Sequence, residues 1–112
     1  MLRLLNLKEY NPTVEQAIAL IQIEIEGCKK SDVSAIKVLH GYGSHGVGGA
    51  IFLELKRLLP SWKKQKYICD YIYGSQWNMF NEATINLLNK DKSILDEDIN
   101  HSNPGITIIV LK

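Results

Sequence analysis

Residues 35–49 read AIKVLHGYGSHGVGG, and this stretch decides how the rest of the chain can be arranged. Residues 35–39 are mostly apolar, which predicts a buried central strand. Five of the eight glycines follow between residues 41 and 49. Ile51, Leu55 and Leu58 then recur at helical spacing, which predicts an amphipathic helix. A strand that enters a helix through a glycine-rich turn is typical of an α/β fold.

The flanking segments continue this alternation of strands and helices. Residues 13–16, Thr-Val-Glu-Gln, have the form of a capping box and predict a helix start. Asn103, Pro104 and Gly105 form a turn signal before the apolar residues 106–111. We expect strands at residues 2–7, 35–39, 66–73 and 106–111. We expect helices at residues 13–27, from the glycines to Pro60, and at 78–88, the last with Phe80 on its apolar side. Residues 91–103 are predicted to form a long loop.

The order of these elements predicts an α/β two-layer sandwich with a mixed four-stranded sheet. Strands that alternate with helices favour a parallel arrangement of at least the first two strands. The long excursion before the last strand favours a mixed sheet. We therefore expect a single domain over residues 1–112, with two helices in βαβαββ order and an inserted helix before the last strand.

Composition excludes several classes of protein. The chain has 112 residues, 46% of them hydrophobic, and a formal net charge of +1, which is typical of a globular protein and not of a disordered one. The overall charge gives no sign of a nucleic-acid or membrane partner, so such evidence must be local. No apolar run approaches the roughly 20 residues that span a bilayer. The two cysteines, Cys28 and Cys69, form no C-x-x-C pair, and we expect a reduced, cytoplasmic protein.

The glycine-rich segment is the first candidate binding site. Glycines let a ligand approach the main chain closely, and the start of the following helix favours an anion such as phosphate. A tight turn alone would need only one or two of these glycines. Residues 41–46 satisfy G-x-G-x-x-G, but they follow the second strand, and no acidic residue stands about 20 positions on, so a dinucleotide site is the weaker alternative.

A second candidate is the basic stretch at residues 56–66, which contains five cations and no acid. Trp62 and Tyr67 lie in or beside it and could stack on bases. The plainer interpretation is that these cations complement a helix C-terminus and face solvent. Local charge therefore favours a polynucleotide backbone over a free nucleotide as the source of phosphate.

The histidines beside the glycines are the candidate catalytic groups. An imidazole in a loop can act as a general acid or base, bind phosphate, or only hydrogen-bond within a turn. His40 and His45 flank the first glycines, and His101 lies in a separate turn. No His or Cys spacing predicts a metal site, although His40 and His45 are near enough in sequence to share a zinc ion.

Three segments resemble the small MutS-related (Smr) domain family. Residues 36–49 are similar to its H-G-x-G core, residues 13–17 to its T-V-E-E-A helix start, and residues 103–112 to its closing G-x-T-x-V-x-L strand. The resemblance covers most of the chain except residues 74–102, which look like an insertion. It implies a fold similar to the C-terminal domain of translation initiation factor three.

The resemblance also implies DNA or RNA binding, with roles in DNA repair and recombination or in RNA and ribosome quality control. Many members cleave nucleic acid with an L-D-x-H motif at the end of the first strand. In this chain the corresponding residues are Leu5, Asn6, Leu7 and Lys8. An amide replaces the acid and a lysine replaces the histidine, which predicts a weak or inactive nuclease, while Lys8 could still contact phosphate.

We therefore expect a domain that binds DNA or RNA and no membrane. The enzyme hypothesis is phosphodiester hydrolysis with His40 as the acid or base and a divalent metal ion as cofactor. A third hypothesis is a protein-interaction module, in which Ile23 and the inserted helix meet a second copy of the chain or another protein. The predicted phosphate- and nucleic-acid-binding residues are Lys8, His40, Gly41, Tyr42, Gly43, Ser44, His45, Gly46, Gly48, Gly49, Lys63, Lys64 and Lys66.

Overall fold

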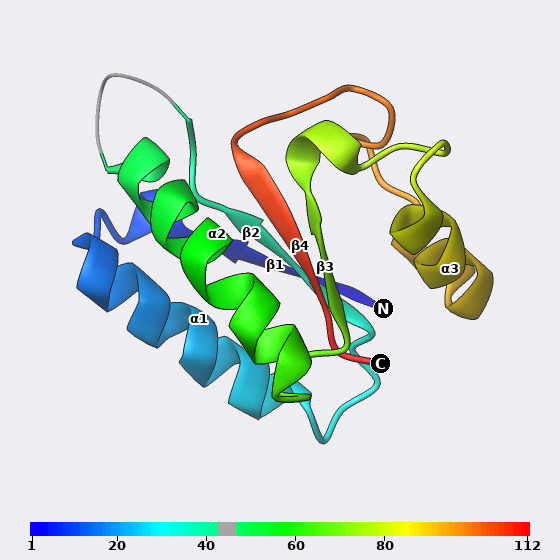
Figure 1. Ribbon diagram of the computed structural model, residues 1–112, viewed down its shortest axis with the longest axis horizontal. Helices are drawn as coiled ribbons and strands as arrows, with labels where there is room; N and C mark the ends of the chain where they lie inside the picture. The colour runs from blue at the N-terminus through cyan, green and yellow to red at the C-terminus, as the bar shows by residue number, and fades with distance from the viewer. Residues whose placement is uncertain (43–46) are drawn as a thin grey trace.

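The computed structural model describes residues 1–42 and 47–112, and its centre is a mixed four-stranded sheet (Figure 1). The strand order is β1-β2-β4-β3. β1 pairs with β2 in parallel, whereas β4 runs antiparallel to both β2 and β3. The strands are β1 (Leu2–Asn6), β2 (Ala35–Leu39), β3 (Asp70–Tyr73) and β4 (Ile106–Val110). The predicted α/β class and mixed sheet are confirmed.

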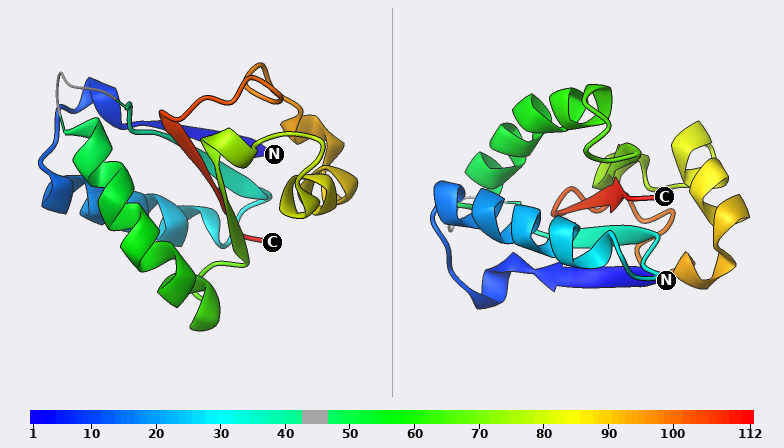
Figure 2. Two further views of the ribbon diagram at one scale, coloured as in Figure 1. Left: turned by 45° about the horizontal axis from the view of Figure 1, so that its top comes forward. Right: turned by 90° about the horizontal axis from the view of Figure 1, so that it is seen from below.

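Two helices cover one face of the sheet (Figure 2). α1 (Val14–Cys28) begins at Thr13, whose side chain and that of Gln16 form the predicted capping box. α2 (Gly48–Lys64) packs beside α1. Their apolar faces meet the sheet in a core whose fully buried members include Ile21, Ile25, Ile36, Ile51, Leu55, Leu59 and Ile109. Burial of this apolar area is the main term that stabilises the layer.

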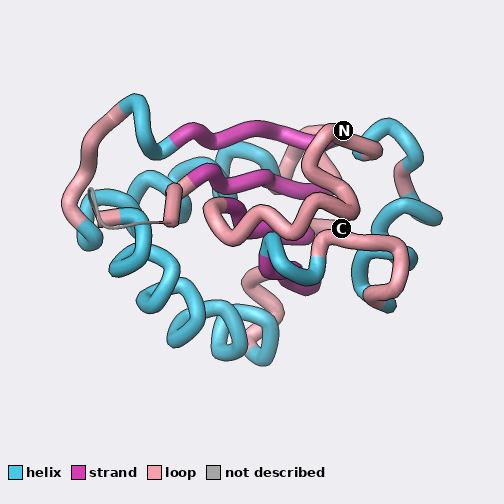
Figure 3. The backbone as a smooth tube through the Cα atoms, turned by 90° about the horizontal axis from the view of Figure 1, so that it is seen from above, coloured by secondary structure: helices cyan, strands magenta, loops and turns pink. Residues whose placement is uncertain are grey.

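The segment between β3 and β4 covers the opposite face. It contains α3 (Glu82–Lys90), which lies across the sheet from α1 and α2 (Figures 2 and 3). Trp77 is completely buried there and packs with Leu87, Ile94 and the outward side of β4. Residues 74–102, predicted as an insertion, thus bury the second face. β2 and β4 are buried on both sides, which explains their nearly continuous apolar sequences.

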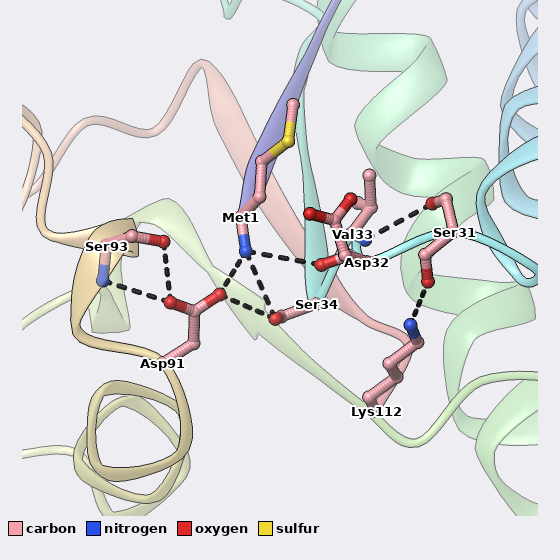
Figure 4. Close-up of polar contacts among 8 residues, drawn as sticks. All are labelled: Met1, Ser31, Asp32, Val33, Ser34, Asp91, Ser93 and Lys112. Atoms are coloured by element: carbon pink, nitrogen blue, oxygen red, sulfur yellow. Dashed lines mark hydrogen bonds and ion pairs between the residues drawn. The ribbon is translucent and has the colours of Figure 1, made fainter.

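Hydrogen bonds to Asp91 join the N-terminus, just before β1, to the segment between β3 and β4 (Figure 4). The Asp91 carboxylate accepts hydrogen bonds from the Met1 amino group, Ser34 and Ser93. These three donors hold the pKa of Asp91 well below its usual range. The contact joins α3 to the segment that leads into β2, far away in sequence.

Three predicted boundaries were wrong by four residues each, and each error has a local cause. α2 continues through Pro60 to Lys64, because Trp62, two residues after Pro60, buries its ring in the core. β3 begins at Asp70, because Lys66 adopts a positive φ of 61° and the amides of residues 67 and 68 bond back to Trp62. α3 begins after its cap, Asn81, so Phe80 lies outside the helix and is 97% exposed.

Within residues 1–42 and 47–112, no helix is long and apolar enough to cross a membrane.

Candidate nucleic-acid interface

The parallel pairing of β1 and β2 brings two predicted residues together at one edge of the sheet. β1 ends at Asn6, whose side chain accepts a hydrogen bond from the Lys8 amide and starts a short 3-10 turn. β2 ends beside it, and Gly41 follows with a φ of 80°. A Cβ built on Gly41 would lie 3.7 Å from Cδ and Cε of Lys8. The exposed Lys8 side chain therefore lies over the start of the glycine-rich segment.

The first turn of α2 reaches the same edge. A Cβ built on Gly48 would lie 2.5 Å from the His40 carbonyl oxygen and 2.7 Å from that of Gly41. Only glycine lets the helix begin this close to the end of β2. A Cβ on Gly49 would meet nothing within 4 Å. Close packing therefore explains why residue 48 is a glycine, whereas it gives no reason for a glycine at residue 49.

Four of the predicted site residues fall on the part of the chain that is not placed. Gly43, Ser44, His45 and Gly46 lie outside the described residues. The predicted site residues that the structure describes at this edge are Lys8, His40, Gly41, Tyr42 and the two glycines that begin α2.

The His40 ring is buried and bonded on both sides. It is 3% exposed. Its Nδ1 lies 2.8 Å from the Gly41 carbonyl oxygen, so Nδ1–H donates, and its Nε2 lies 2.9 Å from the Thr107 hydroxyl, which donates to it. The ring also stacks on Phe52, with centroids 5.4 Å apart. In this arrangement His40 joins the ends of β2 and β4 and supports Phe52, and neither ring nitrogen faces solvent as an acid or base would.

Burial makes His40 a source of acid sensitivity. Desolvation lowers the pKa of His40 below its ordinary value, and this outweighs the hydrogen bonds to Gly41 and Ile106, which favour the charged ring. The unfolded chain, with an ordinary histidine pKa of about 6.5, then binds a proton that the folded chain does not. We expect the free energy of unfolding to fall as the pH drops below about 6.5. Urea titrations at several pH values measure this dependence. The free energy of unfolding of His40→Gln should fall less steeply with decreasing pH than that of the wild type, and an equal dependence on pH in the two proteins would contradict this.

A row of aromatic rings continues from this edge along the junction of α2 and β3. Phe52 meets Tyr42 edge-on at 6.3 Å and Tyr73 edge-on at 5.6 Å, and Tyr73 meets Tyr71 at 5.5 Å. A hollow of about 460 Å³ opens over the first part of this row. We call this hollow the aromatic groove; it is lined by Tyr42, Gly49, Phe52, Leu53 and Lys56.

The predicted stacking residues lie elsewhere. Trp62 is buried in the core and meets Tyr67 edge-on at 5.4 Å, so its faces are not open to bases. The sequence did not single out Phe52 or Tyr73. Phe52 and Lys56 are four positions apart, so the helical spacing predicts that both lie on one face of the helix. No pattern in the neighbouring sequence predicts that Tyr73, in β3, contacts them.

The predicted lysines 63, 64 and 66 lie at the far end of α2 from Lys8. At 1.5 Å per residue, Lys63 is roughly 22 Å from Gly48 along the helix. Its ammonium lies 3.1 Å from an Asp70 carboxylate oxygen, which raises the pKa of Lys63 and offsets its charge. The structure thus separates the cations predicted for one site into two regions.

A second and larger hollow, of about 610 Å³, lies between α1 and α2. Apolar side chains such as Ile18 and Leu58 line it together with Glu15, Glu54 and Arg57, so charges of both signs surround it. Arg57 is bonded to Glu54. Among the described residues, no group of three or more His, Cys, Asp or Glu side chains could hold a metal ion.

Compared with family models, with curated proteins and with solved structures, the chain matches none.

Proposed function

We propose that this chain is a nucleic-acid-binding domain of the Smr type, with the fold of the C-terminal domain of initiation factor three, and that it holds phosphate where β1 and β2 end. The observation that carries this proposal is the position of Lys8 over Gly41, beside the first turn of α2. A lysine and the positive end of a helix there favour an anion, whereas the Gly41 amide already donates a hydrogen bond to the Gly105 carbonyl oxygen at 2.9 Å. The α2 cap residue, Val47, makes no side-chain cap hydrogen bond to this turn.

The charges around this edge fit a polyanion better than a single small anion. Lys8 lies over Gly41, and the exposed Lys56 lines the aromatic groove with Tyr42 and Gly49. Lys64 and Lys66 add exposed positive charge at the far end of α2, where Asp70 offsets the charge of Lys63. The roughly 22 Å between the two ends of α2 corresponds to about seven nucleotides of a B-form strand, at about 3.4 Å each. A polynucleotide could contact both ends, whereas a mononucleotide could not.

The geometry favours binding over cleavage. Hydrolysis of a phosphodiester needs an acid or base, or a metal-bound water, within reach of the reacting atoms. His40 is buried and has protein partners on both nitrogens. Asn6 holds the turn that positions Lys8 and supplies no carboxylate. We therefore propose a binding protein rather than an efficient nuclease.

Lys8→Gln should weaken the binding of oligonucleotides and reduce its salt dependence. Loss of one phosphate contact should lower the slope of log K against log salt by about 0.7 for a single strand or about 0.9 for a duplex. Fluorescence anisotropy at several salt concentrations measures both quantities. Lys30→Gln is the matched control, since Lys30 is an exposed lysine that follows α1 at the opposite edge of the sheet. The proposal fails if no DNA or RNA binds, or if the two variants bind equally well.

A further inference from the structure

The aromatic groove is lined by exposed apolar and aromatic side chains that are not part of the buried core. Tyr42 is 63% exposed and Leu53 68% exposed, although both line the groove. Phe52 is fixed between them, because His40 stacks under it and Tyr73 abuts its edge. Two protein rings therefore hold Phe52 in place, and the exposed Tyr42 lines the groove beside it.

Charge in the groove has one sign. The Lys56 ammonium lies 5.2 Å from the centre of the Phe52 ring and 5.7 Å from that of Tyr73. The described lining contains no carboxylate. Asp70, which precedes Tyr71 in the row of rings, is paired with Lys63. A ligand in the groove thus meets aromatic surface and one unpaired cation.

We propose that the groove binds a single-stranded nucleic acid, with a base stacked on Tyr42 and the backbone at Lys56. This rests on the proposed function, because the same strand would place its next phosphates at Lys8. Bases stack on aromatic side chains with either face, so such a site requires little sequence specificity. Lys56 is held over the rings by cation–π attraction and is thereby placed beside any base that stacks there.

The groove suits a single strand rather than a duplex for two reasons. In a duplex the faces of the bases are covered by their neighbours, so Tyr42 could reach only the backbone. A duplex must then be held by charge alone, and tight binding of this kind needs several phosphate contacts. The groove offers Lys56 and, next along the row, a lysine already paired with Asp70. Stacking must therefore supply much of the affinity.

The test compares three labelled oligonucleotides of about twelve nucleotides, single-stranded RNA, single-stranded DNA and duplex DNA, by fluorescence anisotropy. We expect both single strands to bind at least tenfold more tightly than the duplex. Tyr42→Ala should weaken single-strand binding roughly tenfold, since stacking on one aromatic side chain has about that effect. Tyr42→Phe should retain most of the affinity. Lys56→Gln should weaken binding and lower the salt slope by about 0.7.

Phe80→Ala is the matched control, because Phe80 is an exposed aromatic residue on the segment that covers the other face of the sheet. It should bind like the wild type. If the duplex binds as tightly as the single strands, or if Tyr42→Ala matches Phe80→Ala, the groove is not a base-stacking site, even when Lys8→Gln shows that nucleic acid binds. If no oligonucleotide binds, both this inference and the proposed function fail. Circular dichroism of each variant is used to test whether its fold is retained.

Discussion

Gly74→Ala should lower the free energy of unfolding by about 3 kcal/mol or more, because the added methyl group has no space. Gly74 is buried where β3 ends and the covering segment begins. A Cβ there would lie 1.7 Å from the Asn103 carbonyl oxygen and 2.8 Å from both the Cγ1 and the carbonyl oxygen of Ile106. Two of these three atoms are backbone, so the start of β4 would have to move with them.

The effect should be visible in thermal unfolding. Since about 1 kcal/mol corresponds to roughly 4–8 °C in a domain near this size, Gly74→Ala should lower Tm by more than about 10 °C. Gly27→Ala is the control, since a Cβ on Gly27, in α1, would meet nothing within 4 Å. Alanine in a helix should stabilise the protein there by about 0.5–1 kcal/mol. A Gly74→Ala protein as stable as the wild type would show that Gly74 does not pack against Asn103 and Ile106 as described.

Lys37→Met should lower the free energy of unfolding by about 3 kcal/mol at neutral pH, since it leaves two carboxylates without their cation. Lys37 lies in the middle of β2 and is nearly buried. Its ammonium is 2.6 Å from Asp96 and also contacts Asp98. Burial would lower the pKa of Lys37, but the hydrogen bonds to these two carboxylates outweigh it and raise the pKa.

The same change should reverse the effect of acid on stability. In the wild type the hydrogen bond from Lys37 lowers the pKa of Asp98, so this pair stabilises the fold above the ordinary aspartate pKa of about 3.9, and the stabilisation is lost as the pH falls through the lowered value. In Lys37→Met the two facing carboxylates repel one another, and protonation relieves the repulsion. As the pH falls from 7 to 5, the free energy of unfolding of Lys37→Met should therefore rise relative to that of the wild type.

Urea unfolding at both pH values measures this prediction, with Lys63→Met as its control. Lys63 makes an ion pair with Asp70 at 3.1 Å, but both side chains are substantially exposed. Such a surface pair contributes about 0–1 kcal/mol, so Lys63→Met should change stability little. Equal losses in the two variants would show that the Lys37 contact carries no more than a surface pair.

The Lys37 contact also explains how the covering segment is held on the sheet. Asp96 accepts a hydrogen bond from the Trp77 indole nitrogen at 2.9 Å, and Asp98 accepts one from Asn103 at 3.2 Å. Asp96 and Asp98 lie in the segment that was predicted as a long loop, and they are the partners of a lysine in the central sheet.

The sequence alone determined the elements whose signals lie within a few neighbouring residues. The capping box at Thr13, the apolar strand at residues 35–39 and the start of α2 among the glycines were all predicted, because caps and hydrophobic periods are local properties. The last strand was predicted at residues 106–111, and β4 spans Ile106–Val110. Tertiary structure decided the burial of His40, the pairing of Lys37 and the row of rings from Tyr42 through Phe52 to Tyr73. These features join residues that are distant in the chain, and their contacts form only when the sheet brings them together, so no local pattern encodes them.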